Sequence, residues 1–177
     1  VSAGEDIMKY MIDYMKKDAF NIVVIEGPMG QSAQLQRMEG IENVLKDYPD
    51  IQILAQNTAN WSRSEAMTLM ETWITTYGDD IDAVVSENDE MALGAREAIE
   101  AQSMDIPCIG IDGITDAVVA VESGKMIASD FQNAEGQITG ALETAVKCVN
   151  NEDYEKELWI PFEMITPDNY KDYQSKY

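Results

Sequence analysis

Apolar residues along this chain alternate between two spacings, one typical of amphipathic helices and the other of buried strands. From Ile7 to Met15 they recur at helical spacing, which predicts a helix with one apolar face. The run Ile22 to Ile25 is instead short, continuous and rich in β-branched residues, and Gly27 follows it closely. Such a run predicts a strand that is covered on both faces.

The same alternation continues along the rest of the chain and indicates the fold class. Further short strands are expected at Ile51 to Leu54, Ala83 to Val85, Ile106 to Ile111 and Met126 to Phe131. Helices are expected between them, followed by a long helix from about residue 135 to residue 150. Strands and helices in this order predict an α/β fold, in which a Rossmann-like parallel sheet carries helices on both faces.

The helix expected after Gly30 follows the first strand directly. Its apolar face is predicted to consist of Leu35, Met38, Ile41 and Leu45. The loop that leads into it contains glycines, but it has neither the GxGxxG pattern nor the lysine of a phosphate-binding loop. We therefore expect this loop to be an ordinary strand-to-helix turn.

The carboxyl-terminal part of the chain departs from the regular alternation. A highly polar segment, residues 151–157, separates the long helix from the apolar run Leu158 to Ile165. This run predicts a last strand, but that strand has no obvious place in the sheet formed by the earlier ones. We expect it to find substitute cover, for example by association of two copies of the chain.

Composition and charge narrow the classes of function. The chain has 177 residues, which suits one domain that buries roughly 70% of its unfolded surface. A net charge of −21 repels nucleic-acid phosphates and anionic lipid, so no nucleic-acid partner is expected. The absence of histidine excludes His-dependent catalytic triads and zinc sites that use His. Cys108 and Cys148 lack CxxC spacing, and both are expected to be small buried core residues.

Candidate binding residues follow the strands, because ligands of parallel sheets sit at the carboxyl ends of the strands. Trp61 follows the second strand and suits either a core anchor or a flat platform for a sugar ring. After the third strand, Asp89 suits a helix N-cap, and the amide of Asn88 suits hydroxyl groups that donate and accept. After the fourth strand, Asp112 suits either hydroxyl binding or a turn with Gly113.

The same acidic residues suit two enzyme classes. Paired carboxylates occur in glycosidases, and Asp89, Glu90 and Asp112 together suit a Mg²⁺ site of a phosphotransferase. Their spacing is specific for neither class. We therefore expect no catalytic residue, no metal site and no cofactor.

Several segments resemble ribose-type periplasmic sugar-binding proteins, the solute-binding proteins of ABC transporters. Val84 to Ala95 closely resembles their ND-x-MALGA segment, and Ile109 to Gly113 resembles their V-G-F-D-G. Val121 to Met126 resembles the V-x-x-G-K/R that follows, and Gln132 falls where the family has a Gln after a strand. The order and spacing of these segments fit over essentially the whole chain.

The resemblance implies one lobe of a type I periplasmic-binding-protein fold. That family has two Rossmann-like lobes joined by chain crossings, and they close around a monosaccharide. Residues 1–132 are expected to form the carboxyl-terminal, sugar-binding lobe. Residues 133–177 are expected to be a return segment that belongs to a largely missing amino-terminal lobe, which would explain the unplaced last strand.

The resemblance also implies a binding site. The sugar contacts of the family fall at Trp61, Asn88, Asp112 and Gln132. Two positions depart from the family, because an Arg that clamps the sugar falls at Leu35 and an aromatic residue falls at Ile111. These departures argue against ribose and leave other pentoses, hexoses, polyols and signalling sugars open.

The function implied is non-covalent binding of a sugar or polyol for delivery to an ABC permease, and not catalysis. The location implied is periplasmic or extracellular, with a lipoprotein anchor left open. The alternative is the effector domain of a LacI-type transcription regulator, which usually has G-F-D-D where this chain has Gly110 to Gly113. The isolated chain is expected to bind sugar weakly or not at all, because one lobe leaves a bound sugar partly solvated.

Overall fold

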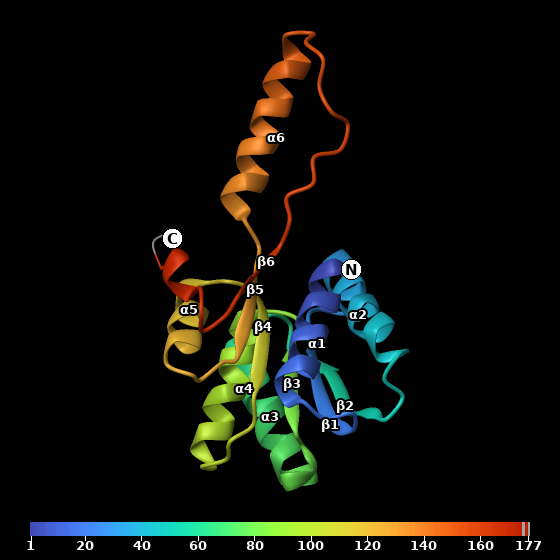
Figure 1. Ribbon diagram of the computed structural model, residues 1–177, viewed down its shortest axis with the longest axis vertical. Helices are drawn as coiled ribbons and strands as arrows, with labels where there is room; N and C mark the ends of the chain where they lie inside the picture. Colours follow the sequence, from blue (N-terminus) through green and yellow to red (C-terminus); the bar gives the residue numbers. More distant parts are fainter. Residues whose placement is uncertain (175, 177) are drawn as a thin grey trace.

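The computed structural model describes residues 1–174 and 176 and contains one six-stranded sheet (Figure 1). The order across the sheet is β2-β1-β3-β4-β5-β6. In chain order the strands are β1 (Phe20–Glu26), β2 (Ile51–Thr58), β3 (Ala83–Ser86), β4 (Cys108–Asp112), β5 (Ala128–Phe131) and β6 (Glu163–Ile165). The neighbours from β2 to β5 pair in parallel, and β6 runs antiparallel to β5.

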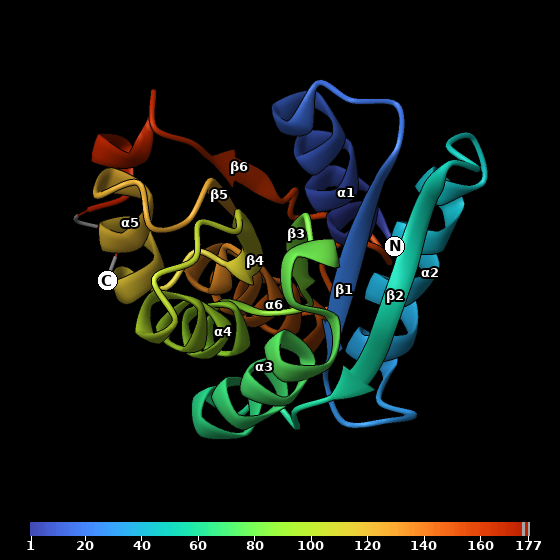
Figure 2. The same cartoon turned by 90° about the horizontal axis from the view of Figure 1, so that it is seen from below.

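Helices cover both faces of the sheet, so the predicted α/β fold class is confirmed (Figure 2). One face carries α1 (Ser2–Met15) and α2 (Ser32–Leu45), which pack on each other. The other face carries α3 (Arg63–Tyr77), α4 (Asp89–Ala101) and α5 (Thr115–Glu122). Short 3₁₀ turns occur at Gly78–Asp80 and Tyr170–Asp172.

The two-sided cover explains the continuous apolar run of β1. Ile22 and Val24 belong to the core cluster under α1 and α2, whereas Val23 and Ile25 belong to the cluster under α3 and α4. Side chains of a strand alternate between the faces of a sheet, so a strand covered on both faces needs apolar residues at every position.

The face of α2 that packs on the protein differs from the predicted one. Met38 and Ile41 are buried as expected, but Leu35 is 55% exposed. Two polar residues, Gln34 and Arg37, are buried instead. The expectation for Leu35 is wrong because the inner face of α2 extends toward the carboxyl ends of the strands, where polar groups gather.

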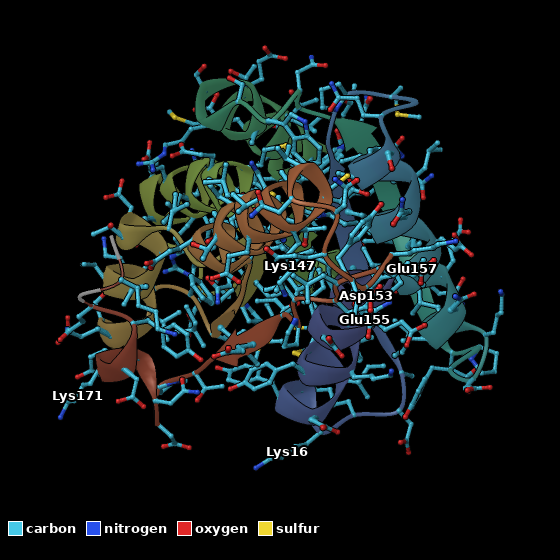
Figure 3. All side chains as sticks on the ribbon, turned by 90° about the horizontal axis from the view of Figure 1, so that it is seen from above. Lys16, Lys147, Asp153, Glu155, Glu157 and Lys171 are labelled. Carbon is cyan, nitrogen blue, oxygen red and sulfur yellow. The ribbon has the colours of Figure 1, made fainter. Side chains whose placement is uncertain are left out.

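An arm leaves the body after β5 and returns to it at β6 (Figure 1). It consists of α6 (Ala134–Val149) and the connection 150–162. Gly140 is the buried residue of α6, whereas Trp159 in the connection is 83% exposed. Figure 3 looks down on this arm and shows Asp153, Glu155 and Glu157 on the connection beside α6.

The apolar run at the end of the chain finds its place in this sheet. Only its last part, Glu163–Ile165, forms a strand, and Ile165 pairs with Ser129 of β5 and is fully buried. The Tyr173 ring packs edge-on against Phe131, with 5.2 Å between the ring centroids. The expectation that this run lacks a place in the sheet is therefore wrong for β6. The division of the chain at residue 132 stays a prediction.

The two cysteines have different environments. Cys108 is buried in the core, as predicted, and its burial raises the thiol pKa to about 12. Cys148 lies exposed on α6, so the expectation that it is buried is wrong. The apolar spacing of α6 is real, but no layer of the described chain covers that helix. Within residues 1–174 and 176, no helix combines the length and apolarity required to cross a bilayer.

Candidate functional site

A small open pocket lies at the carboxyl ends of the strands, near the point where β1 and β3 lead in opposite directions across the sheet. Such switch points are where open α/β sheets bind ligands, because the loops that follow the strands part there. The pocket has a volume of about 260 Å³. Its lining residues are Gln31, Ala33, Arg37, Trp61, Asn88 and Asp112.

The Arg37 guanidinium lies at the centre of this group, although no arginine was predicted at the site. Its Nη2 donates to Asp112 Oδ1 at 3.1 Å and to Gln132 Oε1 at 3.0 Å. Its Nη1 donates to the carbonyl oxygen of Glu87, the residue before Asn88. The guanidinium carbon also lies 5.6 Å from the centre of the Trp61 ring, in cation–π range. One side chain thus links the loops after β2, β3, β4 and β5.

The expectation that the site lacks an Arg, because the relevant position holds Leu35, is wrong. Leu35 is exposed and does not line the pocket, whereas Arg37 is only 9% exposed and does. The two residues lie half a helical turn apart and therefore face different sides of α2. The sequence contains one signal for an arginine at the site. Arg37 directly precedes Met38 on the buried face of a helix that follows a strand.

Asn88 has two roles in the structure. Its Oδ1 accepts a hydrogen bond from the Met91 backbone N–H at 3.0 Å, so Asn88 is the N-cap of α4. The expectation that Asp89 is this cap is wrong, because the Asp89 carboxylate points inward to other partners. The cap uses only the amide oxygen of Asn88. Asn88 is also a lining residue of the pocket.

Asp112 ends β4 beside Arg37. Its backbone φ is 123°, in a region that residues with a side chain rarely adopt, and Gly113 follows with φ 71°. Burial raises the pKa of the Asp112 carboxyl, and the Arg37 charge opposes this change. The two predicted roles of Asp112 are both compatible with its position, because it lines the pocket and also precedes the turn at Gly113.

Trp61 is part of the core and part of the pocket wall. Its ring packs against the cluster under α3 and α4, and its Nε1 donates to Gln31 Oε1 at 2.9 Å. The ring also covers Gly27, where an added Cβ would lie 2.1 Å from ring carbons. The Gly27 N–H in turn donates to the buried Glu87 Oε2 at 2.7 Å. Gly27 and Gln31, in the loop after β1, therefore fix the position of the Trp61 ring.

Gln132 lies beside the pocket and is not one of its lining residues. Its Oε1 accepts from Arg37, and its Nε2 donates to Gln137 Oε1 at 3.2 Å. Ile111, the other position that departs from the family pattern, is fully buried under α1 and α2. The structure thus brings Trp61, Asn88 and Asp112 to one pocket and joins Gln132 to them through Arg37.

The described residues contain no group of three or more acidic or cysteine side chains arranged to hold a metal ion. Asp89 in particular is fully buried and engaged with backbone and hydroxyl donors. What the pocket offers is a set of hydrogen-bonding groups around an aromatic wall. Such a set suits reversible binding of a ligand with many hydroxyl groups.

Comparisons with known proteins identify the family to which the chain is similar. The profile of the periplasmic binding protein domain matches residues 1–153. The chain is similar to the xylitol-binding protein of Mycolicibacterium smegmatis, with 42% identity over 96% of this chain and 48% of that protein. It is also similar to the ribose import binding protein of Bacillus subtilis, with 32% identity over 94% of this chain and 53% of that protein. The chain spans about half the length of these curated relatives.

A solved structure has the same fold. It is an ABC transporter solute binding protein from Bacillus halodurans with bound myo-inositol, and it matches with a TM-score of 0.92 and 38% identity. The match covers 99% of this chain and 61% of that one. The fold predicted from the sequence is confirmed by this likeness.

Proposed function

The chain belongs to the periplasmic binding protein domain family, and we propose that it binds an uncharged polyol or monosaccharide, without reacting with it, for delivery to an ABC-type importer. The observation that carries the proposal is the pocket that Arg37, Asn88 and Asp112 line together with Trp61. Hydroxyl groups donate and accept hydrogen bonds, so an amide, a guanidinium and a carboxylate together match them. The C–H face of the same ligand packs on the ring.

The charge balance of the pocket favours an uncharged ligand. Arg37 and Asp112 form an ion pair at 3.1 Å, so their charges cancel locally. A phosphorylated or acidic sugar would meet the Asp112 carboxylate without a free positive charge to balance it. A neutral ligand instead shares the hydrogen-bonding capacity that this pair retains.

We assign ligand contacts to Trp61, Asn88, Asp112 and Gln132, as the resemblance implied, and add Arg37. Two relatives support a polyol, since one is named for xylitol and another holds myo-inositol. Ribose is no longer disfavoured by a missing arginine, because Arg37 lines the pocket. The ligand class is therefore stated as polyols and monosaccharides together.

The alternative, an effector domain of a LacI-type regulator, is not favoured. The relatives are named as import or solute-binding proteins of ABC transporters, and none of those compared above is named as a regulator. The same names describe binding and not catalysis. A ligand recovered chemically unchanged after long incubation with the protein is the result expected of a binding protein.

Isothermal titration of the whole gene product that contains this chain tests the proposal. The ligands are myo-inositol, xylitol, D-ribose and D-allose, and glucose 6-phosphate serves as the charged control. We expect a Kd of about 10 μM or lower for at least one neutral ligand and no binding of the phosphate ester. Absence of binding to all the neutral ligands, or preference for the charged one, would contradict the proposal.

The 177-residue chain by itself is expected to bind these ligands weakly or not at all. The pocket is open, so a ligand in it would keep much of its surface in water and gain little from desolvation. The same titration with the isolated chain checks this expectation. A Kd near the micromolar range for the isolated chain would overturn it.

We also propose that the arm formed by α6 and residues 150–162 packs on a second lobe, as the predicted division at residue 132 requires. Large apolar side chains are exposed along the arm at Ile138, Leu142, Val146, Val149, Leu158 and Trp159. Exposed apolar patches of this kind mark surfaces that another protein layer covers. The occupant we infer is the half of the relatives that this chain does not span.

Fluorescence of Trp159 distinguishes a second lobe from pairing of two copies. We expect the Trp159 emission, obtained as the difference from a Trp159→Phe variant, to be blue-shifted in the whole gene product and not in the isolated chain. A concentration-dependent mass of the isolated chain, together with a blue shift, would instead support a homodimer through the arm. Solvent-exposed emission in the whole gene product would contradict the second-lobe proposal.

Membership of the family implies a periplasmic or extracellular location. A lipid anchor is the finer version of this location. Metabolic labelling of the whole gene product with palmitate tests for such an anchor, and the absence of label would exclude it.

A further inference from the structure

Asp89 is a fully buried carboxylate next to the pocket that does not line it. It is the first residue of α4. Its Oδ2 accepts from the backbone N–H of Gly113 at 2.7 Å and of Ile114 at 3.0 Å. The Ser129 hydroxyl donates to the same carboxylate, with oxygen distances of 2.7 and 2.8 Å. One side chain thus joins the start of α4 to the turn after β4 and to β5.

The turn that Asp89 holds contains the strained backbone of Asp112. A φ of 123° at a residue with a side chain costs free energy and persists only when surrounding contacts impose it. The two N–H groups directly after Asp112 are the ones that donate to Asp89. Ser129 Oγ also accepts from the Gly113 N–H at 3.1 Å. The Asp89 carboxylate and the Ser129 hydroxyl therefore both hold the same N–H group.

Helix capping does not explain this carboxylate, because Asn88 already caps α4. The carboxylate occupies space that a larger residue at position 110 would fill, since a Cβ added at Gly110 would lie 2.4 Å from Asp89 Oδ1. Burial raises the pKa of Asp89 to about 8, which shows how unfavourable the charged form is in this place. A buried acidic group is retained at such a cost where its hydrogen bonds hold a required conformation.

We propose that Asp89, together with Ser129, is a positioning residue that holds the Asp112 backbone in its strained conformation and so directs the Asp112 carboxylate to Arg37 and the ligand. The ligand part of this inference rests on the proposed function. The conformational part does not, since it concerns only the turn Asp112 to Ile114.

Amide hydrogen exchange of the 177-residue chain tests the conformational part without a ligand. In Asp89→Ala we expect the Gly113 and Ile114 amides to lose protection by about ten-fold beyond any loss in β1. Asp89→Asn should restore protection, because its amide oxygen accepts from both N–H groups while its NH₂ faces Ser129 Oγ. Ser129→Ala, with an intermediate loss, serves if Asp89→Ala does not fold, and exposed Asp105→Asn is the control. Unchanged protection of both amides in Asp89→Ala and Ser129→Ala would overturn the proposal.

A double-mutant cycle in the whole gene product tests the ligand part, with xylitol and myo-inositol as probes. Asp89→Ala should weaken binding by about ten-fold in the wild-type background and by less than about two-fold in an Asp112→Asn background. Equal losses in both backgrounds would show that Asp89 does not act through Asp112. If the wild-type protein binds neither probe, the proposed function is in question, and the exchange experiment still decides the role of Asp89.

Discussion

Arg37 shows how a single side chain organises this site. Its guanidinium is largely removed from water and is hydrogen-bonded to a carbonyl oxygen, a carboxylate and an amide oxygen at the carboxyl ends of three different strands. Removal of the guanidinium would remove the hydrogen bonds that Asp112 Oδ1 and Gln132 Oε1 accept from it. A partly buried acceptor that loses its donor costs more free energy than the net gain from forming the bond.

Arg37→Met is expected to lower the free energy of unfolding by about 1–3 kcal/mol, because the partners of the guanidinium lose their hydrogen bonds. Ligand binding by the whole gene product should weaken by about ten-fold or more. Urea unfolding and calorimetric titration measure these effects.

The matched control for Arg37→Met is Leu35→Ala, on the exposed side of the same helix. It should change stability by no more than about 0.5 kcal/mol and leave affinity unchanged. A Leu35→Ala variant that loses affinity as strongly as Arg37→Met would show that the exposed face of α2 contributes to ligand binding.

At the scale of elements, the amino-terminal end of α4 combines two tasks in adjacent residues. Asn88 caps the helix with its amide oxygen and lines the pocket, while Asp89 accepts hydrogen bonds from the turn after β4. Both residues were predicted at this helix start, but the cap was predicted at Asp89 and is formed by Asn88. Either residue type is a good N-cap, so local preference does not decide between them. The neighbouring turn decides, because it requires a buried acceptor at position 89.

Asn88→Ser separates capping from ligand binding. A serine hydroxyl caps a helix about as well as an amide oxygen does and places no charge at this buried position, so stability should stay within about 0.5 kcal/mol of the wild type. The substitution removes the NH₂ donor, and binding should weaken by about ten-fold.

Asn88→Ala provides the comparison, because it should lose affinity and also about 1 kcal/mol of stability through the lost cap. Thermal unfolding and titration of both variants check the expectation. Full affinity in Asn88→Ser would mean that the amide donor does not contact the ligand.

The two helices that follow β3 and β5 should differ in local stability. Most of one face of α4 is buried in the core, whereas α6 has Gly140 as its buried residue. A helix without tertiary packing is only marginally stable in water. In the isolated chain, amides of α6 should therefore exchange at least about ten-fold faster than those of α4. Equal protection in a time course read by mass spectrometry would show that the arm is covered by other means.

At the scale of the whole molecule, buried acids couple stability to pH. Burial is the main cause that raises the pKa of Glu87 to about 8, that of Asp89 to about 8 and that of Asp130 to about 7. Between about pH 4 and pH 8 these groups keep protons in the folded state that the unfolded chain releases. The unfolded state then binds fewer protons, so stability falls as pH rises through this range.

The expected result is a Tm that is higher near about pH 5.5 than near about pH 8.5, measured by calorimetry at constant ionic strength. Asp130→Asn should flatten this dependence, because a neutral amide replaces a buried acid whose Oδ2 has no hydrogen-bond partner in the described part of the chain. Exposed Asp105→Asn should not alter it. A Tm that rises between these two pH values would contradict the assignment of raised pKa values.

The sequence by itself determined the alternation of strands and helices and the residues at the strand ends. Both are local properties, since burial on two faces requires continuous apolar runs and a parallel sheet brings all its strand ends to one edge. Trp61, Asn88 and Asp112 could therefore be selected without coordinates.

Only the tertiary structure decided which side of α2 supplies the arginine, that β6 pairs with β5, and that Cys148 is uncovered. These features depend on contacts between segments far apart in the chain. An apolar spacing indicates that one face of a helix is buried, but it does not state where the polar residues on that face point. The direction of the Arg37 side chain is set by its hydrogen bonds to Glu87, Asp112 and Gln132. These three residues come together only after the sheet has formed.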